Sequence, residues 1–323
     1  MAFNNLISRT DSAALIPEEA ANEIIKAVEE INPLMRLARR LPNMSRAQKR
    51  MPVMSALATA GFVAGDTGLK QTSEVNWANS YIDAEEVGVI VPIPESVLDD
   101  ADYDLWSEVQ PEMVKAISNA ITSAVLFGSN IPASWTTNLG AAGLLARCVA
   151  AGHNPSLAAF ADAYEAILGE TAAGVDGAFM LVEADGYAVN GVVAHPSVKG
   201  LLRNLRDADG NPIFKTSMQD ATRYELDGAP LYFPTDGSMV AASALMFVGD
   251  WTQLVYSIRT DISYKVLDQA VIQDNAGTII YNLAQQDMVA LRAVMRLGFA
   301  LPNPINAMNA TAATRCAFAA LVP

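Results

Sequence analysis

Apolar residues recur at every fourth position over a long stretch in the first half of the chain. The series is Leu105, Val109, Met113, Ile117, Ile121 and Val125, which is the spacing of one face of a helix. Asp102 or Asp104 can cap the start of this helix and Gly128 can close it, so it is expected over 105–127. At the standard rise it spans about 35 Å, which is long for a globular domain. Pro111 falls in its second turn, where a proline kinks a helix or delays its start.

Other segments carry shorter periodic patterns. A helix is expected over 17–31, where Pro17 suits the first turn, and an alternating strand over 87–93. The two kinds of element are interspersed, which favours an α+β fold without internal repeats. Further expected elements are a helical face over 157–168, a buried strand at 191–194, a helix opened by His195-Pro-Ser and continuing to 205, a turn at 206–212, strands at 229–233, 244–248, 253–258, 262–267 and 278–283, and a helix or strand over 288–301.

The segment 42–80 lacks a core pattern and gathers turn-forming residues, among them Pro42, Pro52 and Gly61. A stretch of this length without its own pattern is unusual inside a compact domain, and such stretches are usually functional or disordered. Phe62 and Trp77 lie within it. We therefore expect it to be ordered by docking on something else.

Composition narrows the possible functions. Hydrophobic residues make up 51% of the 323 residues and charged residues 17%, an apolar excess that contacts between subunits can bury. The net charge of −14 argues against a protein that binds nucleic acid by neutralising the backbone phosphates with basic side chains. No apolar stretch is long enough to span a membrane, and the first residues do not resemble a secretory signal. The two cysteines, Cys148 and Cys316, could pair but are more typical of a reducing compartment.

The charges are segregated along the chain. One stretch, 31–65, has bases but no acid, and another, 71–114, has acids but no base. The usual interpretation is two solvated faces, and the alternative is two complementary patches that meet within one subunit or between neighbours. The bases are Arg36, Arg39, Arg40, Arg46, Lys49 and Arg50, with Lys70 following, and the acids include Asp99, Asp100, Asp102 and Asp104.

Candidate catalytic and metal-binding motifs are weak. Cys148 and His153 could act as nucleophile and base, but nothing marks a third, orienting group. Asp207, Asp209, Gly210 and Asn211 faintly resemble a calcium loop, yet Met218 occupies the position of its bidentate glutamate. Gly140-Ala-Ala-Gly143 lacks the lysine of a phosphate loop. The acidic cluster 99–104 could in principle hold magnesium, but the default interpretation is a solvated start of a helix. The sequence therefore predicts no enzyme, cofactor or metal.

The order of the motifs resembles that of a known family. Leu-Ile-Pro-Glu-Glu-Ala-Ala-Asn-Glu-Ile-Ile (15–25) precedes Asn-Pro-Leu-Met-Arg-Leu-Ala-Arg-Arg-Leu-Pro (32–42) and Gly-Leu-Lys-Gln-Thr-Ser-Glu-Val-Asn-Trp (68–77). After the long helix come His-Pro-Ser (195–197), Leu-Asp-Gly-Ala-Pro-Leu (226–231) and Gly-Asp-Trp (249–251). This series resembles the major capsid proteins of tailed double-stranded-DNA phages, which have the Hong Kong 97 fold. The likeness covers roughly residues 12–306.

The resemblance implies an architecture and a function. It implies a structural protein that self-assembles into pentamers and hexamers of an icosahedral shell around phage DNA; an encapsulin-like nanocompartment shell is the alternative. It would be assembled in the host bacterial cytoplasm, with a separate scaffolding protein, a portal protein and, in some shells, a decoration protein as partners. It would bind neither membranes nor specific nucleic-acid sequences. The implied parts are an N-terminal arm (1–35), an extended loop (36–82), a peripheral domain with a long spine helix (83–138 and 255–306), an axial domain (139–254) and a C-terminal tail (307–323) that can clasp a neighbour.

The founding relative cross-links its shell through a lysine, an asparagine and a catalytic glutamate. Lys70 matches the lysine position, but the asparagine position falls on Asp287 and the glutamate position on Val294. A carboxylate is a poor acyl acceptor at neutral pH, and valine cannot take a proton. The resemblance therefore predicts a shell without this cross-link.

Overall fold

The computed structural model describes residues 32–63, 65, 68–100, 105–169, 174–206, 209, 211, 224–274 and 276–323. The helix expected over 17–31 and most of the turn expected over 206–212 lie outside these ranges. The chain divides into two compact units. Of the described residues, those within 86–118 and 260–296 form the first unit, and those within 32–85, 119–259 and 297–323 form the second.

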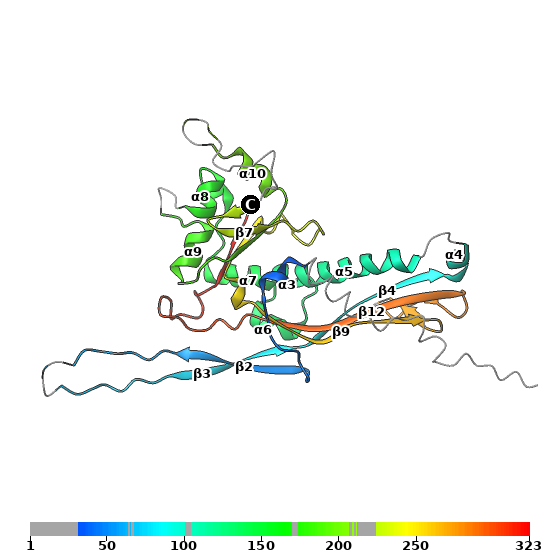
Figure 1. Cartoon of the computed structure of the whole chain (residues 1–323), viewed down its shortest axis with the longest axis horizontal. Coiled ribbons are helices and arrows are strands. Elements are labelled where there is room, and N and C mark those ends of the chain that lie inside the picture. The colour runs from blue at the N-terminus through cyan, green and yellow to red at the C-terminus, as the bar shows by residue number, and fades with distance from the viewer. Residues whose placement is uncertain are drawn as a thin grey trace, which may run out of the picture. The chain divides into compact units, whose positions relative to one another are not determined.

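Four long elements continue from one unit into the other. The expected helix over 105–127 is confirmed as a single helix that runs through Pro111 (Figure 1), so the proline does not delay its start. The alternating strand expected at 87–93 is also confirmed, and the segment over 288–301 is a strand. These elements are α5 (Leu105–Phe127), β4 (Glu85–Pro94), β9 (Val255–Leu267) and β12 (Met288–Ala300).

A four-stranded sheet has the order β1–β9–β12–β4. Strand β1 (Arg39–Arg40) pairs with β9 in parallel, with Arg39 opposite Val255. The two strands expected at 253–258 and 262–267 are one continuous strand, β9. The first unit also holds helix α4 (Glu95–Asp100) and a short antiparallel ribbon of β10 (Val271–Gln273) and β11 (Ile279–Asn282).

The second unit is built around a five-stranded sheet in the order β13–β8–β5–β7–β6. Its central strand β5 carries the run Gly-Val-Val-Ala, which is fully buried, as a strand inside a two-sided core must be. Trp251 donates from Nε1 to the carbonyl of Gly191 at 2.8 Å and meets Phe318 edge to face. The strands are β5 (Gly191–Ala194), β6 (Glu225–Leu226), β7 (Ala229–Tyr232), β8 (Met246–Gly249) and β13 (Phe318–Leu321).

Short helices surround this sheet. The helical face expected over 157–168 is broken into η2 and α8, because Asp162 caps a new helix by accepting from the backbone N–H groups of Tyr164 and Glu165. The helices of this unit are α3 (Pro33–Leu37), α6 (Ala133–Leu139), α7 (Gly143–Ala151), η2 (Leu157–Ala159), α8 (Ala163–Leu168), α9 (Ala178–Ala184), α10 (Val198–Asn204) and η3 (Trp251–Gln253).

Two glycines permit close backbone contact where α5 ends. Gly128 and Gly143 both have positive φ angles, of 70° and 61°. A Cβ at Gly128 would lie 2.4 Å from the carbonyl oxygen of Ala141, and one at Gly143 would lie 2.5 Å from that of Val125. The motif Gly140-Ala-Ala-Gly143 is thus accounted for by a tight connection between helices.

The end of the chain is part of the core. Phe318 and Leu321, expected to anchor a tail, lie in β13, which pairs antiparallel with β8. All four side chains of β13 are buried. This part of the segment 307–323 therefore completes the sheet of its own subunit.

Candidate interaction surface

The segment 42–80 contains two strands that the sequence did not reveal. Strand β2 (Gln48–Ala56) and strand β3 (Asn76–Asp83) form an antiparallel ribbon. Figure 1 shows them side by side as a long two-stranded ribbon. The side chains of both strands alternate between two faces. Because the charged Lys49 lies on the inner face and the apolar Met54 on the outer one, neither face forms a continuous apolar stripe in the sequence.

The inner face of the ribbon packs on its own subunit. Ile82 is fully buried and forms a small core with Met44, Val255 and Ala300, against which Met51 packs. This core anchors one end of the ribbon.

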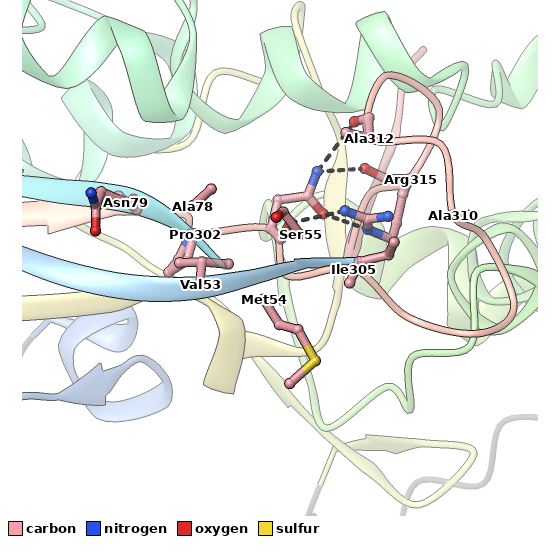
Figure 2. Close-up of a pocket in the computed structure, with 12 residues that line it drawn as sticks. Val53, Met54, Ser55, Ala78, Asn79, Pro302, Ile305, Ala310, Ala312 and Arg315 are labelled. Atoms are coloured by element: carbon pink, nitrogen blue, oxygen red, sulfur yellow. Dashed lines mark hydrogen bonds between the residues drawn. The ribbon is translucent and has the colours of Figure 1, made fainter. Parts of the chain in front are cut away.

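A cavity of about 210 Å³ lies next to Val53 and Ala78 of the ribbon. Its opposite wall is the segment 302–315, which Arg315 holds in place. The buried guanidinium of Arg315 donates to the side-chain and backbone oxygens of Asn303 and to the carbonyl of Asn309. Figure 2 shows Arg315 facing the cavity while the side chain of Met54 points away from it. The C-terminal segment thus braces the ribbon, and Ile305 donates its N–H to the carbonyl of Met54.

The outer face of the ribbon is exposed and carries large apolar side chains among polar ones. The register places Met54 opposite Trp77, and Arg50 opposite Tyr81, on this face. The side chain of Trp77 is 65% exposed, and Phe62 and Leu69, in the connection between the strands, are 110% and 90% exposed. We call Met54, Phe62, Leu69, Trp77 and Tyr81 the ribbon patch.

The ribbon patch is a candidate contact surface. A two-stranded ribbon is marginally stable alone and needs a packed face, which the core around Ile82 supplies on the inner side. Large apolar side chains that stay exposed are typical of protein–protein contacts. Burying each stabilises a contact by about 1.5–3 kcal/mol.

Most of the predicted basic residues precede strand β2 or lie on it. Arg36, Arg39, Arg40, Arg46 and Arg50 are exposed, and Lys70 is exposed in the connection between β2 and β3. Arg36 lies over the ring of Tyr232, 5.6 Å from its centroid. Lys49 is half-buried and donates to the carbonyl of Pro42 at 2.8 Å. Lys49 thus has a role inside its own subunit, and the side chains of the five arginines are exposed.

The predicted acidic residues are only partly described. Asp99 is exposed on helix α4, to which Asp100 also belongs, whereas Asp102 and Asp104 lie outside the described residues. Two other carboxylates of the acidic stretch are already paired within the chain. Glu86 pairs with Arg296, and Glu112 pairs with Lys115.

The positions aligned with the cross-linking residues keep ordinary structural roles. Asp287 is exposed in a turn with a φ angle of 47°, and its carbonyl accepts from the N–H of Glu95. Val294 is half-buried on β12. Asp287 thus offers a carboxylate instead of an amide, and Val294 offers no base.

The candidate pair Cys148 and His153 belongs to a buried polar cluster. The Nε2 atom of His153 lies 3.4 Å from Oδ2 of Asp185, and its Nδ1 atom lies 3.1 Å from the carbonyl oxygen of Phe318. Burial lowers the pKa of His153, although Asp185 and the Phe318 carbonyl act in the opposite direction. Asp185 is the orienting group that the sequence did not mark, because it lies 32 positions beyond His153.

This cluster stabilises the fold of the second unit. Asp185 accepts from the backbone N–H of Cys316 and from the side chain of Asn309, both at 2.7 Å. All members except Asn309 are buried. The arrangement therefore ties the C-terminal segment to helices α7 and α9.

Across the ranges that the structure describes, no three His, Cys, Asp or Glu side chains come together as a metal site. The calcium-loop positions Asp207 and Gly210 fall outside those ranges. Among the described helices, none is both long and apolar enough to cross a membrane.

Comparisons with known proteins agree with this architecture. The model of the phage capsid family matches residues 12–309. The major capsid protein of Staphylococcus phage 80alpha is 25% identical over 302 residues, which cover 91% of this chain and 84% of that protein. Among solved structures, a chain from Microbacterium phage Oxtober96 is 32% identical with a TM-score of 0.73, over 99% of this chain and 100% of that one. A chain from Mycobacterium phage Bobi is 31% identical with a TM-score of 0.73, over 99% of both.

The chain belongs to the phage capsid family. Its α+β fold is of the Hong Kong 97 type, and it is a phage major capsid protein, a structural protein of the shell. These matches confirm the resemblance stated from the sequence and do not favour the encapsulin-like alternative.

Proposed function

We propose that this chain assembles into pentamers and hexamers of an icosahedral shell around phage double-stranded DNA, with the ribbon patch lying on a neighbouring copy. The observation that carries the proposal is the exposure of Trp77, Phe62 and Leu69 on a ribbon whose other face is packed. A neighbouring copy supplies the apolar surface that the ribbon needs. Contacts of this kind join two different patches, so they close into rings when the rotation permits.

Charge complementarity adds to this contact. The arginines at 36–50, which precede strand β2 or lie on it, are exposed, and Asp99 is exposed on α4. Pairing between the basic stretch and the acidic stretch of another copy would fix the orientation of the contact rather than supply most of its affinity. The chain would act without catalysis or cofactor, alongside a separate scaffolding protein, a portal protein and, in some shells, a decoration protein, inside the host bacterial cytoplasm.

Assembly is the test of this proposal. The purified chain should elute from a size-exclusion column as pentamers, hexamers or closed shells, and negative-stain microscopy should show rings or icosahedral particles. A stable monomer over a wide range of salt and protein concentration would contradict the proposal.

The subunits of the shell should be held together without covalent cross-links. Lys70 is exposed, but Asp287 offers a carboxylate in place of the amide, and Val294 cannot act as the general base. Boiling mature particles in detergent with reductant should therefore release one band near the chain mass of 34.3 kDa. A ladder of higher multimers would show a cross-link and refute this prediction.

A further inference from the structure

Three side chains of helix α6 donate hydrogen bonds to the chain at the anchored end of the ribbon. Two of the acceptors are backbone carbonyls of alternate residues, so they point toward the same edge of β3. Strand β2 pairs along the other edge. The bonds run from the Ser134 hydroxyl to the carboxylate of Glu85, from Trp135 Nε1 to the carbonyl of Asp83 at 2.9 Å, and from the Asn138 amide to the carbonyl of Tyr81 at 2.8 Å. Helix α6 therefore covers a strand edge that β2 leaves open.

Helix α6 is itself fixed to the core of the second unit. Residues four apart lie on the same side of a helix, and one such pair, Trp135 and Leu139, is 2% and 0% exposed. The ring of Trp135 meets that of Phe299 edge to face, with 5.7 Å between the centroids. The adjacent pair, Ser134 and Asn138, is not fully buried and makes the bonds to Glu85 and Tyr81. One row of α6 thus holds the helix in place, and the next row holds the ribbon.

The anchored end of the ribbon has little room to move. A Cβ at Gly298 of β12 would lie 2.5 Å from both the carbonyl oxygen of Asp83 and the Cγ2 atom of Ile82, so the strands approach each other closely there. Ala84, which alone separates β3 from β4, donates its N–H to the carbonyl of Ala47 at 2.8 Å. Because this end is packed, the bonds from α6 determine the direction in which the ribbon continues from it.

We infer that helix α6 is a clamp that sets the direction in which the ribbon leaves the subunit, with Ser134 and Asn138 as positioning residues for assembly. The inference rests on the proposed function, in which the ribbon patch lies on a neighbouring copy. Strand β3 has eight residues and spans about 25 Å at the usual rise. A rotation of about 10° at its anchored end moves the other end by about 4 Å, which is the full reach of an apolar contact.

The direction of the ribbon can be measured in the unassembled subunit. Spin labels are attached to Asn76→Cys, at the far end of β3, and to Tyr164→Cys, on α8, because both positions are exposed. The two natural cysteines are buried and take no label. The double variant Ser134→Ala, Asn138→Ala should give a broader distribution of distances between the labels than the natural α6, as measured by pulsed electron spin resonance at a subunit concentration too low for assembly.

Assembly should weaken in parallel in the unlabelled double variant. When fewer ribbons point in the direction that fits a neighbour, the apparent affinity between copies falls by the same fraction. The subunit concentration needed for half-maximal assembly should rise by about 5–30-fold, which is the factor that two hydrogen bonds of ordinary strength correspond to. The circular dichroism spectrum should stay that of the natural chain, because neither Ser134 nor Asn138 is part of the buried core.

Matched variants on the same helix separate the clamp from a general effect on α6. Thr136 donates its hydroxyl to the carbonyl of Ala133 within the helix, and Thr137 is exposed, so Thr136→Ala, Thr137→Ala should change neither the distances nor the assembly. Asn138→Asp keeps the size of the side chain but removes its donor, and together with Ser134→Ala it should act like the double alanine variant.

Two results would overturn the inference. An unchanged distance distribution in the double variant would show that α6 does not set the direction of the ribbon. A broader distribution with assembly at the natural subunit concentration would show that Ser134 and Asn138 do not position the ribbon for assembly. Because the distance measurement needs no assembly, it tests the clamp separately from the proposed function.

Discussion

Shells should fail to form when Trp77 and Phe62 are both replaced by serine. The side chains of Trp77 and Phe62 are 65% and 110% exposed. Removing two buried apolar groups weakens each contact between copies by about 3–6 kcal/mol, which lowers its association constant by at least roughly 100-fold. The measurement is the yield of particles on a sucrose gradient at a fixed concentration of subunit.

A matched control distinguishes assembly from folding. Val149 is also exposed in the second unit, at 52% on helix α7, outside the ribbon and the segment 302–315, so Val149→Ser should leave the yield unchanged. The circular dichroism spectrum and melting temperature of the unassembled Trp77→Ser, Phe62→Ser subunit should match those of the natural chain. A normal yield of particles from the double variant would show that the ribbon patch is not an assembly contact.

Reversing Arg39 and Arg40 to glutamate should block assembly without unfolding the subunit. Both side chains are exposed on the short edge strand β1. If the basic stretch meets acids of another copy, the substitutions place like charges opposite each other, which costs several kcal/mol at a poorly screened contact. Particle yield measured over a range of salt concentrations checks this, because added salt should partly restore assembly.

The compensating variant tests the pairing itself. Adding Asp99→Arg and Asp100→Arg to the reversed chain should restore at least part of the yield. Lys265→Glu, on an exposed position of β9, is the control for a change in net charge alone. Normal particles from the arginine variant, or a charge-swapped variant that assembles no better than the arginine variant, would exclude this pairing.

Local patterns predicted much of the fold. Helix α5 begins and ends where its apolar series and Gly128 place it, because a helix of this length is determined by its own periodicity. Strand β5 was recognisable from four small apolar residues, and β4 from its alternation. The family resemblance rests on the order of such motifs along the chain.

The features that the sequence did not reveal depend on long-range contacts. The ribbon mixes charged and apolar residues on both faces, since Lys49 faces inward to Pro42 and Trp77 faces solvent in the single subunit. Strand β13 is made of residues that are small and apolar in any context, and only its pairing with β8 identifies it as part of the core. Asp185 gains its role from partners far away in the sequence, such as Cys316.

The position of the ribbon in the assembled particle tests the central claim most directly. A cryo-electron microscopy map that resolves side chains should show Trp77 and Phe62 buried against a second copy of the chain, with Arg39 or Arg40 within reach of a carboxylate of a neighbouring subunit. A ribbon that projects into solvent, with these side chains as exposed as they are in the single subunit, would contradict the account.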